Sequence, residues 1–330
     1  MTSTPETGTA TSQDARGGGS PPAPPPSGEQ YELRHADQAV TVVEVGGGIR
    51  SYAVAGAEML DGYAVDEMCT GARGQTLVPW PNRVRDGRYE FDGETYQLPL
   101  AEPEKGNAIH GLLRWSAWAA VEQGPTRVVL ACRLHPQAGY PFTLDVRNEY
   151  ALGPDGLTVT TVATNVGARA CPYALGFHPY LGAGLARVDG ATVTIAAETY
   201  LPTDDRGIPT GRRPVAGTPY DFREPRRLGD VEIDYTFTDL RRDARGRAAV
   251  TVADADRGRA VTLWVDESFA YLEIFTGDAL PEPERRRAGL GVEPMTAPPD
   301  AMRTGTDLRR LAPGDTATTT WGIRAGVDPA

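Results

Sequence analysis

The sequence predicts an all-β protein built as a large antiparallel β-sandwich. From about Glu29 onward, short runs rich in Val, Thr, Ile, Leu and Tyr alternate polar and apolar residues with a period of two. Turns containing Gly, Asp and Pro separate these runs. No stretch of about 12 or more residues keeps a helical periodicity, and there is no fixed-period repeat of the propeller or solenoid type.

The chain of 330 residues divides into a tail and a folded region. Residues 1–28 hold no Val, Ile, Leu, Phe or Tyr, and a segment of that composition cannot offset the entropy lost on ordering. We predict a disordered N-terminal tail over 1–28, a single β-sandwich domain over 29–326 and a short C-terminal tail over 327–330. A compact two-domain all-β arrangement is the alternative.

Individual runs carry the strand and turn predictions. The runs at 157–164 and 261–266 alternate apolar residues with Thr or other polar residues, so each has one face toward a core. Asp92-Gly93 lies between RYEF and ETYQL and predicts a tight hairpin. The glycines at 46–48 lie between two short strand-like runs with no helix following, which favours a hairpin turn and supports neither a phosphate loop nor a dinucleotide fingerprint. The long polar segment 204–227 is a candidate wall of a cleft.

Charge and hydropathy exclude several classes of partner. Lys and Arg number 33 against 44 Asp and Glu, giving a net charge of −11, and no basic block is interleaved with aromatic residues, so a nucleic-acid partner is not expected. No segment approaches 18 uninterrupted apolar residues, and the tail lacks the apolar run of a secretory signal. We expect a cytoplasmic protein without a membrane partner, either a monomer or a homodimer.

The three cysteines, Cys69, Cys132 and Cys171, are odd in number and widely spaced, without a CxxC pair. This pattern argues against a disulfide framework and a structural zinc site, so we expect buried free thiols.

Two of the four histidines are candidates for a site. His35 and His135 lie in polar segments and are expected at the surface. His110 in NAIHGLLRW and His178 in ALGFHPYLG lie among glycines and apolar residues, and a glycine beside an imidazole lets a ligand come close. Either one alone is equally well explained as a core histidine with satisfied hydrogen bonds. Two such segments in one chain favour a shared site.

Three charged residues join these histidines as candidates. Glu293 in AGLGVEPMTAPPD and Asp234 in VEIDYTFTDL are carboxylates in apolar surroundings, which are costly unless they are paired or used. Arg83 in VPWPNRVRDGRY can present a planar fork to hydroxyl groups. For each of the three, a structural salt bridge or turn cap is the alternative.

Two chemistries suit this set of residues. Two histidines and a glutamate can bind a metal ion that activates water, although the close ligand pairs HxH and HExxH are absent. Without a metal, a carboxylate base and an imidazole acid on either side of the C1–O5 bond of a sugar can open and reclose its ring.

Several motifs together resemble those of the aldose 1-epimerase, or mutarotase, family. They are PWPNRVRDGRYEFDGETYQLPLAEPEKGNAIHGLLRW, GFHPYLG, IDYTFTDL, and FTGD followed by GLGVEPMTAPPDAMRTG. The resemblance runs from about residue 70 to 326. It implies a galactose mutarotase-like supersandwich, an isomerase acting on a hexose aldose, and no metal or organic cofactor.

The resemblance also implies roles for single residues. Glu293 corresponds to the general base that takes the proton of the C1 hydroxyl, and His178 to the general acid that protonates the ring oxygen. His110, Arg83 and Asp234 correspond to residues that bind and orient the sugar.

The sequence departs from the galactose mutarotase pattern beside the acid. An asparagine usually precedes that histidine, whereas Phe177 precedes His178 here. The identity of the sugar is therefore open. A hexose 6-phosphate is one alternative substrate, with Arg212-Arg213 and the Arg285–Arg287 run as candidate phosphate contacts. A sugar-binding module without catalysis is a further alternative.

Overall fold

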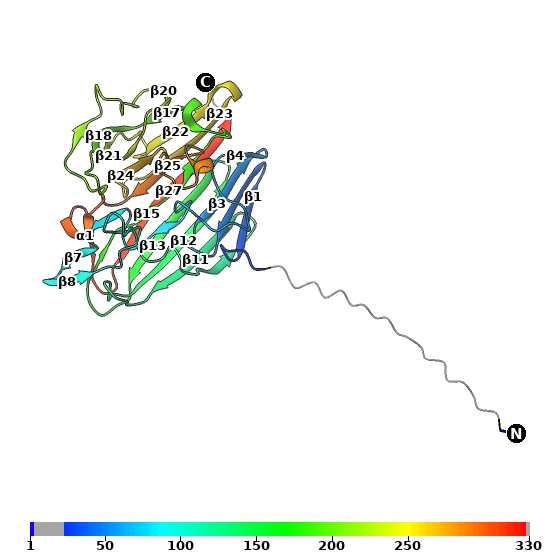
Figure 1. The fold of residues 1–330 in the computed structure, drawn as a ribbon, viewed down its shortest axis with the longest axis horizontal. Helices are drawn as coiled ribbons and strands as arrows, with labels where there is room; N and C mark the ends of the chain where they lie inside the picture. Colours follow the sequence, from blue (N-terminus) through cyan, green and yellow to red (C-terminus); the bar gives the residue numbers. More distant parts are fainter. Residues whose placement is uncertain (3–22, 328–330) are drawn as a thin grey trace.

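The computed structural model describes residues 1–2 and 23–327 and consists almost entirely of antiparallel strands (Figure 1). The predicted all-β sandwich is confirmed. Within the described residues the only α-helix is α1 (Ala301–Thr304), and no helix there is long and apolar enough to cross a membrane. Most of the predicted N-terminal tail and all but one residue of the C-terminal tail lie outside the described residues. Within the described part of the N-terminal tail, Ser27 is buried and its carbonyl accepts a hydrogen bond from Val45 N–H.

The larger layer is a nine-stranded antiparallel sheet. Its strands, in spatial order, are β10 (Ala119–Gln123), β11 (Arg127–Leu134), β12 (Leu144–Gly153), β13 (Gly156–Asn165), β27 (Thr316–Val327), β23 (Arg259–Val265), β22 (Ala248–Asp254), β17 (Thr192–Ile195) and β20 (Arg226–Arg227). The alternation predicted for 157–164 and 261–266 is confirmed: Leu157, Val159 and Ala163 are at most 1% exposed, while the intervening residues are half-buried.

An eight-stranded sheet forms the other layer and carries most of the polar residues described below. It contains β19 (Arg213–Pro214), β18 (Ala197–Leu201), β21 (Asp234–Leu240), β24 (Tyr271–Phe275), β25 (Leu290–Met295), β15 (Gly176–Phe177) and β5 (Thr76–Leu77) in that order, with β16 (Tyr180–Leu181) also paired to β25.

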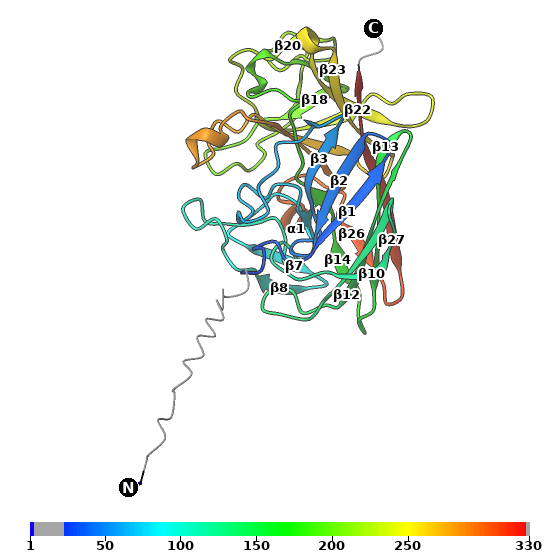
Figure 2. The same ribbon diagram turned by 90° about the vertical axis from the view of Figure 1, so that its right-hand side faces the viewer.

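Smaller units flank these two sheets. One is a four-stranded sheet of β1 (Gln30–His35), β2 (Gln38–Val43), β3 (Ile49–Val54) and β4 (Ala57–Glu58). Three are two-stranded pairs: β6 (Arg83–Arg85) with β9 (Asn107–Ile109), β7 (Arg88–Phe91) with β8 (Glu94–Gln97), and β14 (Cys171–Tyr173) with β26 (Arg309–Leu311). The 3-10 turns are η1 (Val188–Gly190), η2 (Ala255–Arg257) and η3 (Pro283–Arg285). The four-stranded sheet lies against the β10–β13 end of the nine-stranded sheet (Figure 2), where Arg34 N–H donates to the Pro125 carbonyl at 2.8 Å.

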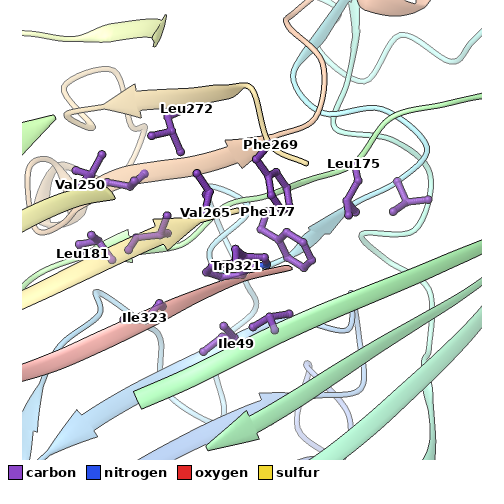
Figure 3. Close-up of a cluster of buried hydrophobic side chains, with 14 of the residues drawn as sticks. Ile49, Leu175, Phe177, Leu181, Val250, Val265, Phe269, Leu272, Trp321 and Ile323 are labelled. Atoms are coloured by element: carbon purple, nitrogen blue, oxygen red, sulfur yellow. The ribbon is translucent and has the colours of Figure 1, made fainter. Parts of the chain in front are cut away.

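The core fills the space between the layers (Figure 3). Phe177 of β15 and Trp321 of β27 pack across it with ring centroids 4.9 Å apart, and both are at most 1% exposed. Because side chains alternate along an extended chain, the residue after Phe177 points away from this core. That residue is His178, so core packing fixes the backbone on which the imidazole stands.

The predicted turns are confirmed. Asp92 and Gly93 both have positive φ, 52° and 80°, as a two-residue hairpin between β7 and β8 requires. The glycines at 46–48 make the turn between β2 and β3.

Two burial predictions need correction. All three cysteines are free, but Cys132, on β11 of the nine-stranded sheet, is half-buried. His135 is exposed as predicted, whereas His35 is half-buried at the end of β1.

Candidate active site

The five residues predicted from the sequence line one cavity of about 410 Å³. They reach it from separate parts of the chain: Arg83 begins β6, His110 follows β9, His178 follows β15, Asp234 begins β21 and Glu293 lies within β25. The sheets therefore bring together side chains that are up to 210 positions apart, from Arg83 to Glu293.

Strand register places one row of polar side chains on the cavity side of the eight-stranded sheet. Glu293 of β25 pairs directly with Glu273 of β24, which pairs in turn with Thr236 of β21. Paired residues on adjacent strands share a face, and Asp234, two positions before Thr236, lies on that face too. The Thr236 hydroxyl donates to Glu273 Oε2.

His178 and Glu293 are in direct contact. His178 Nε2 lies 3.1 Å from Glu293 Oε1, and the two side chains are 6% and 3% exposed. His178 Nδ1 and Glu293 Oε2 are buried without a hydrogen-bond partner among the described residues. Because buried polar atoms are normally paired, such unpartnered atoms beside a cavity indicate groups that bind a ligand.

Burial sets the protonation of this pair. Burial, followed by the charge of Arg114, lowers the pKa of His178 to about 3. Burial, followed by the charges of Glu273 and Asp234, raises the pKa of Glu293 well above its usual value. Both shifts favour the neutral forms, an uncharged imidazole and a protonated carboxyl group.

His110 is held in an unusual backbone conformation. Its φ is +60°, a left-handed value that is uncommon for residues other than glycine. His110 N–H donates to the Asn82 carbonyl at 3.0 Å, and Asn82 N–H donates to His110 Nδ1 at 3.3 Å. Since Nδ1 accepts, the neutral ring carries its proton on Nε2 and is a hydrogen-bond donor there.

Gly111, the next residue, also has a left-handed backbone conformation. Its φ is +70°, and a Cβ at this position would lie 2.2 Å from the Val78 carbonyl oxygen. Only glycine fits so close to a neighbouring backbone. The close approach of the Val78 backbone therefore requires the glycine that follows His110 in GNAIHGL.

Arg83 is anchored by two carboxylates. Its Nε and Nη2 donate to Glu102 at 3.0 and 3.1 Å, and its Nη1 lies 4.0 Å from Asp234 Oδ2. The Glu102 contact fixes the plane of the guanidinium, while Asp234 remains 46% exposed beside it. Asp234 therefore has acceptor capacity left for a hydroxyl group.

Comparison with known proteins agrees with this architecture and these motifs. Residues 29–324 match the sequence profile of the family described as aldose 1-epimerase. The chain belongs to the aldose 1-epimerase family.

Relatives in this family include proteins with and without an assigned activity. The chain is 33% identical over 289 residues to the uncharacterized protein YihR of Escherichia coli K12, covering 87% of this chain and 90% of that protein. It is 32% identical over 278 residues to the galactose mutarotase of Rattus norvegicus, covering 76% and 78%. A crystal structure of a putative aldose 1-epimerase from Escherichia coli K12 has a TM-score of 0.80 at 24% identity, covering 91% and 99%, and so shares the fold.

The arginine clusters considered for a phosphate do not line the cavity of this epimerase-family protein. Arg212 pairs with Asp239, Arg285 with Asp61 and Glu67. These pairs neutralise the guanidinium groups where they lie, so the prediction that they contact a substrate phosphate has no support in the geometry.

The loop 204–227 forms one wall of a cleft, as predicted from the sequence. It lines a neighbouring hollow with Asp204 and Gly207, and a Cβ on Gly207 would meet Arg83 Nη1 at 2.6 Å. This hollow shares Lys105, Asp234, Phe275 and Ala279 with the cavity, so the loop lies next to Arg83 at the edge of the candidate site.

The same residues offer a metal-ligand set. One donor atom each from His110, His178 and Glu293 lie within 4.8 Å of one another. Two imidazoles and a carboxylate are ligands that zinc accepts. The geometry is thus compatible with the metal chemistry considered from the sequence as well as with proton transfer.

Sequence reasoning missed Glu273. This buried carboxylate lines the cavity, and burial, followed by the charge of Asp234, raises its pKa to about 8. Its signal in the sequence is a single acidic residue inside the apolar run YLEIF.

Proposed function

We propose that this protein is an aldose 1-epimerase that interconverts the α and β anomers of a free aldose by opening and reclosing its ring. One observation carries the proposal: the 3.1 Å contact between His178 Nε2 and Glu293 Oε1, buried in the wall of a cavity large enough for a small molecule. An acid and a base side by side are what ring opening requires, whereas a sugar-binding module has no need of such a pair.

The proposed reaction is a balanced exchange of two protons. Glu293 takes the proton of the C1 hydroxyl while His178 gives a proton to O5, so that the C1–O5 bond breaks and C1 becomes an aldehyde. Rotation about C1–C2 presents the other face of the carbonyl. Ring closure then returns the proton of Glu293 to O1 while His178 takes the proton of the O5 hydroxyl.

The pair is suited to working in both directions because it holds one transferable proton. Ring opening begins with that proton on His178 and ends with it on Glu293. The free site favours the proton on Glu293. A shift across the 3.1 Å contact connects the two states, so neither direction needs an outside acid or base.

Three further groups support this role by holding the sugar. His110 offers Nε2–H as a donor, Arg83 offers its anchored fork, and Asp234 accepts from hydroxyls. Holding the reacting atoms in place contributes to rate alongside the proton transfers themselves.

The test is accelerated mutarotation, followed by polarimetry or by NMR exchange between anomers, on a panel of aldoses. Glu293→Gln and His178→Asn should each lower kcat/KM by at least about 10²-fold, the lower end of what one acid or base contributes. Glu94→Gln and His135→Asn change the same residue types at exposed positions and should leave activity unchanged. Circular dichroism reports that all four variants fold.

Two results would contradict the proposal. If the purified protein binds aldoses while anomers exchange at the solvent rate, it is a sugar-binding module. If activity disappears with a chelator and returns with zinc, the His110, His178 and Glu293 set acts through a metal, and the metal-free proton exchange is wrong.

A further inference from the structure

The imidazole of His178 is held by a polar partner at only one of its two nitrogens. Nε2 lies 3.1 Å from Glu293 Oε1, while Nδ1 has no hydrogen-bond partner within residues 23–327. In catalytic histidines of the triad type, a carboxylate bound to the second nitrogen fixes the orientation of the ring. The plane of the His178 ring therefore depends on the side chains packed against it.

Tyr180 stacks on this imidazole. The centroids of the two rings lie 5.0 Å apart, and their planes differ by 22°. His110 contacts the same imidazole edge-on, with the centroids 5.1 Å apart and the planes at 75°. A tilt of the His178 ring would push its atoms into the Tyr180 ring, because buried side chains pack without spare room. Tyr180 is therefore the side chain that restrains the plane of the imidazole.

The local sequence His178-Pro179-Tyr180 brings these two rings together. The residue before a proline is restricted to extended conformations, and side chains two positions apart on an extended chain share a face. Both rings therefore leave the backbone on the same side. Val292 N–H donates to the Pro179 carbonyl at 3.0 Å, and Asp61 N–H donates to the Tyr180 carbonyl at 2.9 Å. These bonds fix the backbone from which the stacked rings project.

The Tyr180 ring is itself held by several independent contacts. Its hydroxyl donates to the Gly71 carbonyl at 2.9 Å, and a Cβ on Gly289 would lie only 2.9 Å from Tyr180 Cβ. The guanidinium of Arg73 lies over the ring, with Cζ 4.7 Å from the centroid, a favourable cation–π distance. Arg73 is 2% exposed, and its Nε donates to Asp61 Oδ2 at 3.0 Å. The imidazole thus packs against a ring that has little freedom to move.

We propose that Tyr180 is a positioning residue, whose ring sets the plane of the His178 imidazole so that Nε2 stays directed at Glu293 and at O5 of a bound sugar. This inference rests on the proposed function, because it takes His178 as the group that protonates O5. The Tyr180 hydroxyl is engaged with Gly71, so the contribution comes from the aromatic ring and not from a proton of the tyrosine.

A positioning role has a distinct kinetic signature. His110, Arg83 and Asp234 hold the sugar in the proposed function, so a tilted imidazole leaves sugar binding intact. The same tilt takes Nε2 out of line for proton transfer, and small misplacements of a reacting group are costly in rate. Loss of the Tyr180 ring should therefore lower kcat and leave KM nearly unchanged.

The experiment compares Tyr180→Phe, which keeps the ring, with Tyr180→Met, whose flexible side chain fills the space without an aromatic face. Anomer exchange is measured by NMR on the aldose that the wild-type protein accelerates most. Tyr180→Met should lower kcat roughly tenfold, the upper end of the preference that an aromatic pair gives to one arrangement, and Tyr180→Phe should retain the wild-type kcat. Tyr96→Met is the matched control, because Tyr96 stacks on Tyr89 with centroids 5.1 Å apart and does not line the cavity; it should change neither kcat nor KM.

Crystal structures of the two Tyr180 variants give a readout that does not depend on activity. Tyr180→Phe should keep the 3.1 Å contact between His178 Nε2 and Glu293 Oε1, and Tyr180→Met should show the imidazole tilted or in more than one orientation. Tyr180→Leu replaces Tyr180→Met if that variant does not fold.

Three results would overturn the inference or the function beneath it. If Tyr180→Met keeps the wild-type kcat, or keeps the imidazole in its plane, the positioning role is wrong while the epimerase function stands. If Tyr180→Phe loses as much kcat as Tyr180→Met, the hydroxyl carries the effect and the role of the ring is wrong. If the wild-type protein accelerates no aldose, the epimerase function fails, and the crystal structures still decide whether Tyr180 sets the plane of His178.

Discussion

Replacing Glu273 with glutamine tests whether the row of carboxylates in the cavity is held protonated. Glu273 is 3% exposed, and burial, followed by the charge of Asp234, raises its pKa from 4.5 to about 8. A carboxyl group with a raised pKa contributes stability that is complete below its unfolded pKa and is lost as the pH rises through the folded value. At 1.36 kcal/mol per pKa unit, the loss for Glu273 is about 4 kcal/mol between pH 4.5 and 8.

The glutamine side chain introduced by Glu273→Gln does not titrate, yet its amide oxygen can still accept from the Thr236 hydroxyl. Between pH 5 and 8, we therefore expect the free energy of unfolding of this variant to fall by about 4 kcal/mol less than that of the wild-type protein. The measurement is urea denaturation at pH 5, 6, 7 and 8, with the exposed substitution Glu94→Gln as control.

Activity gives a second readout of the same substitution. Because the charge of Glu273 raises the pKa of Glu293, its removal lowers that pKa. The pair then loses its transferable proton at a lower pH, so the alkaline limb of the kcat/KM profile should move toward lower pH. Parallel stability curves would mean that Glu273 is not held protonated in the folded protein, and an unmoved alkaline limb would mean that its charge does not act on Glu293; either result would refute the electrostatic reasoning.

Two further predictions concern the support of the site. Gly111→Ala should lower the free energy of unfolding, measured by urea denaturation, by more than about 3 kcal/mol, because it adds a clash with the Val78 carbonyl to the strain of a positive φ. Gly93→Ala is the control. It has a φ of +80° with open space around it, so it should cost only about 1 kcal/mol. Equal losses would show that the close approach to Val78 does not matter. Arg73→Met should cost about 3 kcal/mol by the same measurement, because it removes the buried guanidinium that pairs with the half-buried carboxylate of Asp61 at 3.0 Å. A loss below about 1 kcal/mol would show that the Arg285 contact alone suffices for Asp61.

The strands were predictable because their signal is local. Along 157–164, each side chain that faces the core is apolar or a small threonine, and the alternation can be read without knowing which strand lies next. The hairpin at Asp92-Gly93 is equally local, since its turn residues are the ones that tolerate positive φ. The order of strands within the sheets has no such signal, because it depends on pairings across long separations.

The site was predictable only where motifs marked it. His110 and His178 stand out through their glycines, and Glu293 through the proline and loop that follow it. Glu273 does not, because β24 is buried on both faces and shows no alternation against which a charged residue is conspicuous. Its partner across the sheet is 20 residues away, and only register brings them opposite each other.

Arg114, which also lines the cavity, was missed for a similar reason. It lies in the same segment as His110, yet nothing in that segment indicates where its guanidinium goes. The answer depends on Gln75, 39 residues earlier, which fixes the turn from which the side chain leaves. A contact of that kind becomes visible only when the chain is folded.

The contact between His178 and Glu293 depends on the register in which β25 pairs with β24. Side chains alternate between faces, so a slip of one residue between these strands would turn Glu293 from the cavity to the opposite side. The same slip would turn every other side chain of that strand to the opposite face as well. The proposed anomer exchange therefore depends on the correct register of the central strands, and a refolding protein should recover it only when that register has been reached.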